Sequence, residues 1–163
     1  MSYVISDANI FIDIDVGGLT QLMIQLPEEF AVPNILYEEE LSEHHPDLPT
    51  FGLRILEVKE EYVQEADRLG VTYPKNSHND LLALVLAKQE NSPLLTGDSK
   101  LKEAAEVEGI TVNGTLWLVD QLFINKLISY EEVNIAYDNT KQDGRRLPWK
   151  EVEKQIKRLR KIN

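Results

Sequence analysis

The chain of 163 residues contains no cysteine, which excludes disulfide bonds and every metal site that is built on thiolates. No apolar run approaches the ~18 residues that a membrane-spanning helix needs. The first residues lack the basic start and the long apolar stretch of a signal peptide. These absences predict a soluble, cytoplasmic protein that does not enter a membrane.

Basic residues are scarce in most of the chain. The formal net charge is 17 − 28 = −11, and residues 141–163 hold nine of the Lys and Arg against three acids. Residues 1–140 therefore carry 8 − 25 = −17. Such an acidic body argues against nonspecific binding to phosphate backbones. A site that holds cations would explain the excess of carboxylates.

Short apolar runs alternate with longer amphipathic segments, a pattern typical of an α/β domain with a mostly parallel sheet. Strands are expected at residues 3–5, 30–32, 53–58, 93–96 and 110–112. Helices are expected after Asp7 and over 34–43, 59–69, 77–91, 100–108, 114–128 and 130–138, with a last one from Pro148 onward. No repeat or linker interrupts the pattern, so residues 1–163 are predicted to form one domain.

Four acidic residues occupy equivalent places in this pattern. Asp7 directly follows the first strand, and Asp98 follows the fourth in Thr96-Gly97-Asp98. Glu39 lies about one turn into the helix after the second strand, and Asp80 lies in the first turn of the helix before the fourth. Because ligands of parallel sheets bind beyond the carboxyl ends of the strands, these acids are expected to converge there.

Convergence of carboxylates is costly without a cation. Two carboxylates about 5 Å apart at an effective dielectric of ~20 repel by roughly 3 kcal/mol. Such a cluster either takes up protons or binds a divalent ion. With oxygen ligands alone, Mg²⁺ or Mn²⁺ fits best, and such a site suits hydrolysis of phosphodiesters.

Four segments resemble, in order, the motifs of PIN-domain nucleases. They are Val4-Ile5-Ser6-Asp7-Ala8-Asn9, Pro33-Asn34-Ile35-Leu36-Tyr37-Glu38-Glu39, Asp80 with Ala87, and Leu94-Leu95-Thr96-Gly97-Asp98-Ser99-Lys100-Leu101. Residues 113–116 and 146–148 resemble a subgroup of bacterial and archaeal PIN proteins. VapC-like toxin subunits belong to the same superfamily.

The resemblance implies a three-layer α/β/α sandwich with a parallel sheet of four or five strands. It implies a motif-bearing core over about 3–120 and a helical C-terminal extension over about 121–163. It also implies a ribonuclease site in which Asp7, Glu39, Asp80 and Asp98 bind Mg²⁺ or Mn²⁺, leaving 5′-phosphate and 3′-hydroxyl ends. RNA is the implied substrate, and an antitoxin or a second copy of the chain is an implied partner.

Each acid also has a purely structural interpretation. Asp7 is a common residue to cap a helix, Ser77-x-x-Asp80 is similar to a capping box, and Asp98 suits a turn. Glu39 has two acidic neighbours, of which Glu40 is the alternative ligand. The corresponding alternative function is a noncatalytic PIN fold that binds RNA or a protein.

Three further features bear on function. Asn9 and Thr96 either contact the substrate or only hydrogen-bond the turns. The last helix has an apolar face that is expected to dock, formed by Trp149, Val152, Ile156 and Leu159. Its basic stripe is either a solvated face or a contact for RNA or an acidic partner, and it consists of Lys154, Lys157, Arg158 and Lys161. A phosphate-receiving signalling domain is disfavoured, because the third strand is followed by Val58-Lys59-Glu60 and no aspartate.

Overall fold

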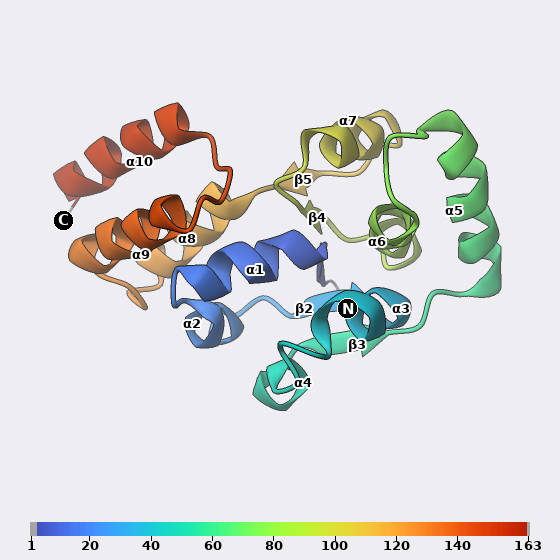
Figure 1. The fold of residues 1–163 in the computed structure, drawn as a ribbon, viewed down its shortest axis with the longest axis horizontal. Coiled ribbons are helices and arrows are strands. Elements are labelled where there is room, and N and C mark those ends of the chain that lie inside the picture. Colours follow the sequence, from blue (N-terminus) through green and yellow to red (C-terminus); the bar gives the residue numbers. More distant parts are fainter. Residues whose placement is uncertain (1–2, 163) are drawn as a thin grey trace.

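The computed structural model describes residues 3–162 of the chain. Its centre is a five-stranded sheet in the order β3-β2-β1-β4-β5, in which every neighbouring pair is parallel (Figure 1). The strands are β1 (Val4–Ser6), β2 (Phe30–Pro33), β3 (Arg54–Leu56), β4 (Leu94–Leu95) and β5 (Val112–Asn113). Helices flank the sheet, so the predicted α/β/α class with four or five parallel strands is confirmed.

Strand β1 is the central strand, and all three of its residues are buried. It pairs with β2 on one side, Val4 opposite Phe30, and with β4 on the other, Ile5 opposite Leu94. Parallel strands that are buried on both faces are continuously apolar, which is why three- and four-residue runs suffice here. Because the strands all run the same way, the residues that follow β1 and β4 emerge side by side.

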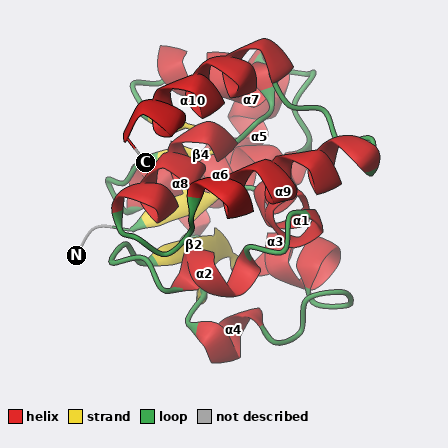
Figure 2. Cartoon of the chain, turned by 90° about the vertical axis from the view of Figure 1, so that its left-hand side faces the viewer, coloured by secondary structure: helices red, strands yellow, loops and turns green. Residues whose placement is uncertain are grey.

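The helices form two groups about the sheet. Figures 1 and 2 show α1 together with α8, α9 and α10, whereas α5, α6 and α7 lie on the other side of the sheet in Figure 1. The described helices are α1 (Ala8–Val16), α2 (Thr20–Ile24), α3 (Asn34–Leu36), α4 (Leu48–Phe51), α5 (Glu60–Thr72), α6 (His78–Gln89), α7 (Ser99–Val107), α8 (Thr115–Ile124), α9 (Tyr130–Gln142) and α10 (Trp149–Ile162).

Helix α6 is the core helix of the domain. It packs on β1, β2 and β4 as well as on α5 and α7, and residues 81–87 are all buried. A helix that is apolar all round belongs in an interior. Among residues 3–162, no helix combines the length and the apolar character that crossing a bilayer requires.

The segment after β2 departs from the predicted helix over 34–43. Helix α3 gives way to a π-helical turn, η1 (Tyr37–Leu41), in which the Ser42 amide donates to the Tyr37 carbonyl over 2.8 Å, five residues back. The predicted α-helix was therefore wrong in type over residues 37–41. It also extended beyond Leu41, where the helical structure ends. The short helices α2 and α4 were also not predicted, because four or five residues show too little periodicity. Pro33 ends β2 from within the strand, opposite Leu56.

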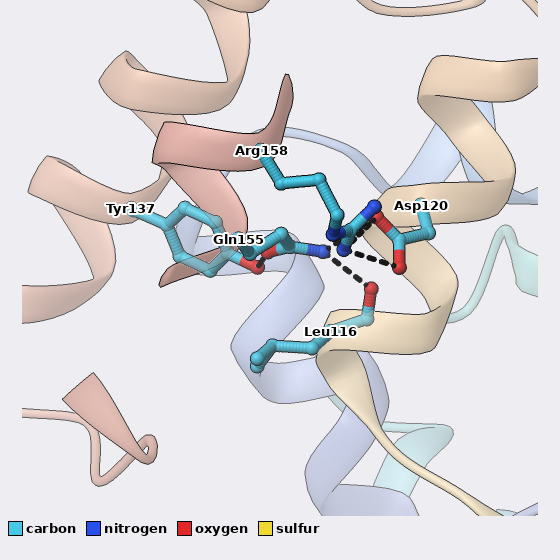
Figure 3. Close-up of polar contacts among 5 residues, drawn as sticks. All are labelled: Leu116, Asp120, Tyr137, Gln155 and Arg158. Atoms are coloured by element: carbon cyan, nitrogen blue, oxygen red, sulfur yellow. Dashed lines mark hydrogen bonds and ion pairs between the residues drawn. The ribbon is translucent and has the colours of Figure 1, made fainter. Parts of the chain in front are cut away.

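Helix α10 docks on the core through its apolar face, as the sequence predicted. Val152 and Leu159 are buried, and Trp149 and Ile156 pack against the core. A polar network completes the contact (Figure 3): the Gln155 side-chain nitrogen donates to the Leu116 carbonyl over 2.7 Å and to Asp120 over 3.0 Å. The Tyr137 hydroxyl donates to the Gln155 side-chain oxygen over 2.5 Å. These bonds tie α10 to the first turns of α8 and to α9.

The basic stripe on α10 is partly engaged within the chain. Arg158 contacts both carboxylate oxygens of Asp120 at 3.0 Å, and Lys154 lies 3.5 Å from Glu151. Lys157 and Lys161 are exposed. Two of the four basic residues are thus paired within the chain, and the other two face solvent.

Candidate active site

Three of the four predicted acids lie at the first turns of three helices. The Asp7 Oδ1 atom caps α1 by accepting from the Ile10 amide at 3.2 Å. The Asp98 Oδ1 atom caps α7 by accepting from the amides of Lys100 and Leu101 at 2.8 and 3.1 Å. These caps hold the two carboxylates at the carboxyl ends of the neighbouring strands β1 and β4.

Asp80 is the third residue of α6 and belongs to a capping box. Its Oδ2 atom accepts from the Ser77 amide at 3.3 Å, while the Ser77 hydroxyl accepts from the Asp80 amide at 3.0 Å. The capping interpretation is therefore confirmed for Asp7 and Asp80, and Asp98, which was expected as a turn residue, also caps a helix. Capping leaves one oxygen of two of these carboxylates free to bind a ligand: Oδ1 of Asp80 and Oδ2 of Asp98 accept no hydrogen bond within residues 3–162.

Thr96 connects the two strand ends. Its buried hydroxyl donates to the Asp7 Oδ2 atom and accepts from the Asp98 amide at 3.0 Å. The Asp7 amide in turn donates to the Leu95 carbonyl at 3.2 Å. Of the two interpretations of Thr96, hydrogen bonding of the turns is the one that the structure shows. Asn9, by contrast, is exposed at the start of α1.

The three aspartates lie close enough to repel one another. Burial raises the pKa of Asp7 to about 7, the hydrogen bonds from Thr96 and Ile10 oppose this rise, and the charges of Asp80 and Asp98 add to it. Burial also raises the pKa of Asp80, again with a contribution from the charge of Asp98. No cationic side chain acts on the pKa of either carboxyl.

This donor set fits a hard divalent cation. Three aspartates that offer only oxygen atoms and repel one another are the kind of ligand set that Mg²⁺ or Mn²⁺ prefers. In the capped arrangement, no three acidic or histidine side chains of residues 3–162 already surround one point as ligands. The oxygens that the caps leave free for an ion are Oδ1 of Asp80 and Oδ2 of Asp98.

Glu39 lies at the edge of this cluster. It is exposed in η1, and its Oε2 atom accepts from the side-chain nitrogen of Asn79 at 3.4 Å. Asn79 precedes Asp80 in α6, and its own Oδ1 atom is buried without a partner in the described chain. Within residues 3–162 Glu40 makes no such contact, so of these two glutamates Glu39 is the one that is tied to α6. Short π-helical turns recur at functional sites.

Two arginines share a cavity with Asp98; Arg145 was not expected there, and Arg146 was noted only as part of the resemblance over residues 146–148. Arg145 forms a 2.6 Å ion pair from its Nε atom to the Asp13 Oδ1 atom in α1. Burial raises the pKa of Asp13 and the Arg145 guanidinium opposes this rise, so Asp13 serves a structural contact. Arg146 then lies beside Gly97 and Asp98. The available clues were the buried position of Asp13 on α1 and the Asp143-Gly144 turn before the arginines.

Two cavities meet at Asp98. One has a volume of about 420 Å³ and extends toward the start of α8. The other has a volume of about 400 Å³ and extends toward α1 and Arg145. Gly97, Asp98 and Arg146 line both. The C-terminal segment, expected as an extension of the core, thus returns to the acidic cluster and forms one of its walls.

Comparison with known protein families gives one match. The model of the family DUF3368, described as a PIN domain, matches residues 3–161. No curated protein matches the chain. The matched range includes the acidic cluster, both arginines and α10.

Proposed function

The chain belongs to the PIN domain family, whose members are usually metal-dependent nucleases, and we propose from this that it hydrolyses RNA phosphodiester bonds with Mg²⁺ or Mn²⁺. The observation that carries the proposal is the group of three mutually repelling carboxylates at the carboxyl ends of β1 and β4 and at the start of α6. They belong to segments far apart in the sequence, and among residues 3–162 no basic side chain contributes to the pKa of Asp7 or of Asp80.

In the proposed site, Asp7, Asp80 and Asp98 hold the ion and Glu39 completes its surroundings or positions a second ion. A bound divalent ion supplies Lewis-acid stabilisation of the charge that builds up at phosphorus and makes water a stronger nucleophile. The Thr96 hydroxyl fixes the orientation of the Asp7 carboxylate. The helix caps hold Asp80 and Asp98 in place. Water attacks phosphorus, the bond to the 3′ oxygen breaks, and that oxygen leaves with a proton as a 3′-hydroxyl.

The test is cleavage of an end-labelled single-stranded RNA by the purified chain with MnCl₂ or with EDTA. We expect cleavage only with the metal, and none with Asp98→Asn or Asp7→Asn. Asp138→Asn is the matched control, because Asp138 is exposed on α9 and its substitution removes the same charge. Equal cleavage by wild type and Asp98→Asn would contradict the assignment. Cleavage of DNA of the same sequence tests the preference for RNA.

The capped arrangement of the carboxylates favours a second candidate, a noncatalytic PIN fold that binds RNA or a protein. In this capped arrangement, no three ligand side chains of the described residues already surround one point. A thermal-shift titration with Mn²⁺ separates the candidates. An ion at 100 times its Kd stabilises the folded state by about 2.7 kcal/mol, so the nuclease proposal expects a rise in Tm that Asp98→Asn abolishes. An unchanged Tm favours the noncatalytic module.

A role as a toxin subunit is a narrower form of the same proposal. The partner antitoxin would cover the acidic cluster, and a second copy of the chain would form a homodimer. Expression of the chain in bacterial cells tests this role. Growth arrest that requires Asp98, and that a small protein encoded beside this chain relieves, is the expected result. Growth unaffected by the wild-type chain contradicts it.

A further inference from the structure

Arg146 is held beside the acidic cluster by its neighbour. The chain turns at Gly144, whose φ is +81°, and Arg145 is fixed to the buried Asp13 carboxylate. Arg146 is exposed and forms no ion pair within residues 3–162. It lines both cavities that meet at Asp98. A guanidinium so placed has its donors available for a ligand that lies across Asp98.

The first turn of α8 lies in the larger of the two cavities. This helix of ten residues has no side-chain cap at Gly114, and the first amides of a helix have no partner inside it. They present a partial positive charge that favours phosphate. The Thr96 amide donates to the carbonyl of Asn113 over 2.9 Å, directly before Gly114. The start of α8 is thereby brought against the strand end that carries Asp98.

Thr115, the first residue of α8, has a hydroxyl group whose role the contacts of the fold do not explain. The residue lines the cavity and is 6% exposed, and its Oγ1 atom is buried without any hydrogen-bond partner in the described chain. A buried polar group that is left unpaired destabilises the folded state. A ligand that reaches this hydroxyl would supply the missing partner.

Charge and size both suit one segment of a nucleic-acid strand. The cavity also contains Lys102 and Glu151, and Lys154 offsets Glu151 from the same helix at 3.5 Å. Its volume of about 420 Å³ lies within the roughly 300–1,000 Å³ of typical ligand sites. The surrounding chain has a net charge of −11, so a polyanion needs local cations to stay beside the carboxylates.

We propose that Arg146, Thr115 and the first amides of α8 form a subsite for a phosphodiester of the substrate strand next to the one that is cleaved. This proposal rests on the proposed nuclease function. The planar, forked guanidinium of Arg146 donates hydrogen bonds to the two nonbridging oxygens of this phosphate. The start of α8 binds the strand beyond it. The subsite sets the affinity for single-stranded RNA and fixes which bond lies over the acidic cluster.

The test measures binding of a fluorescein-labelled single-stranded RNA hexamer by anisotropy, in EDTA, over about 50 to 200 mM salt. We expect Arg146→Ala to weaken binding about tenfold and to reduce the slope of log affinity against log salt by about 0.7, the value for one phosphate contact on a single strand. Arg146→Lys keeps the charge without the fork and should fall between. Arg160→Ala, an exposed arginine on α10 outside both cavities, is the control and should bind as wild type.

Thr115→Val tests the second part without relying on charge. It removes an unpartnered hydroxyl and keeps the side-chain shape, so we expect Tm to be unchanged or higher while RNA affinity falls. A lower Tm with unchanged affinity would show that the hydroxyl is structural and would overturn its assignment. Arg146→Ala that binds RNA like Arg160→Ala would overturn the subsite as a whole.

The binding assay contains no metal and requires no cleavage, so the two proposals fail differently. A chain that never cleaves RNA but loses binding with Arg146→Ala keeps the subsite and refutes the nuclease. A chain that cleaves through Asp98, yet binds and cleaves normally with Arg146→Ala, keeps the nuclease and refutes the subsite.

Discussion

In the absence of metal, replacing Asp7 by asparagine should stabilise the protein at pH 8 and not at pH 4. The pKa of Asp7 is raised from 3.8 to about 7, chiefly by burial, so the folded state holds this proton more tightly than the unfolded state. The resulting stabilisation is fully present below the unfolded value of 3.8 and is lost as the pH rises through 7. At 1.36 kcal/mol for each pKa unit, the loss amounts to roughly 4 kcal/mol.

The assay is urea unfolding in EDTA at intervals from about pH 4 to pH 8. The quantity of interest is the free energy of unfolding of wild type minus that of Asp7→Asn, because most other titrating groups cancel in this difference. We expect it to fall by roughly 4 kcal/mol across the range. Burial is the main cause of the raised pKa of Asp80, with a contribution from the charge of Asp98, and this group gives a pH dependence of the same sign. Asp138→Asn should give a flat difference.

A flat difference for Asp7→Asn as well would refute the reasoning, since it would mean that the Asp7 carboxylate ionises in the folded protein as easily as in the unfolded one. Mn²⁺ provides the complementary measurement. An ion that binds the cluster should restore the stability of the wild type at pH 8. It should leave Asp7→Asn nearly unaffected.

Three further predictions concern other parts of the molecule. Arg145→Ala leaves the buried Asp13 carboxylate unpaired and should lower the free energy of unfolding by about 3 kcal/mol in urea titrations; a loss below that of an ordinary surface substitution would contradict the contact. Tyr137→Phe removes a buried hydrogen bond of the network in Figure 3 and should cost about 1–2 kcal/mol by the same measurement, whereas no loss would contradict the network. Glu39→Gln should weaken Mn²⁺ binding in a thermal-shift titration while Glu40→Gln does not; the reverse result would identify Glu40 as the ligand.

The centre of the sheet was predictable because β1, β2 and β4 are short and fully buried. Runs such as Leu94-Leu95, directly before Thr96-Gly97, have few alternatives to a buried strand followed by a turn. The π-helical turn at residues 37–41 was not predictable, because one additional residue per turn leaves no distinct pattern in a run of three glutamates. Helices α2 and α4 lack the length over which periodicity can be recognised.

The positions of the acids were predictable from strand ends and helix starts, while the contacts that fix them were only partly so. Ser77 and Asp80 have capping-box spacing, and the structure shows that box. The bridge from Thr96 to Asp7 joins residues 89 apart, and the pair of Arg145 and Asp13 joins residues 132 apart. Nothing local specifies such contacts, because they depend on strand order and on the return of the C-terminal segment.

The central position of β1 has a consequence for protein synthesis. The first strand to leave the ribosome receives its neighbour β4 only after residue 95, and Asp7 receives the Thr96 hydroxyl at the same time. The wall formed by Arg145 and Arg146 follows some fifty positions later. Since domains mature from the N-terminal side as they are made, an incomplete nascent chain carries its first carboxylate without a working site. If the chain cleaves RNA, it is therefore able to attack a transcript only after the segment around Arg146 has left the ribosome.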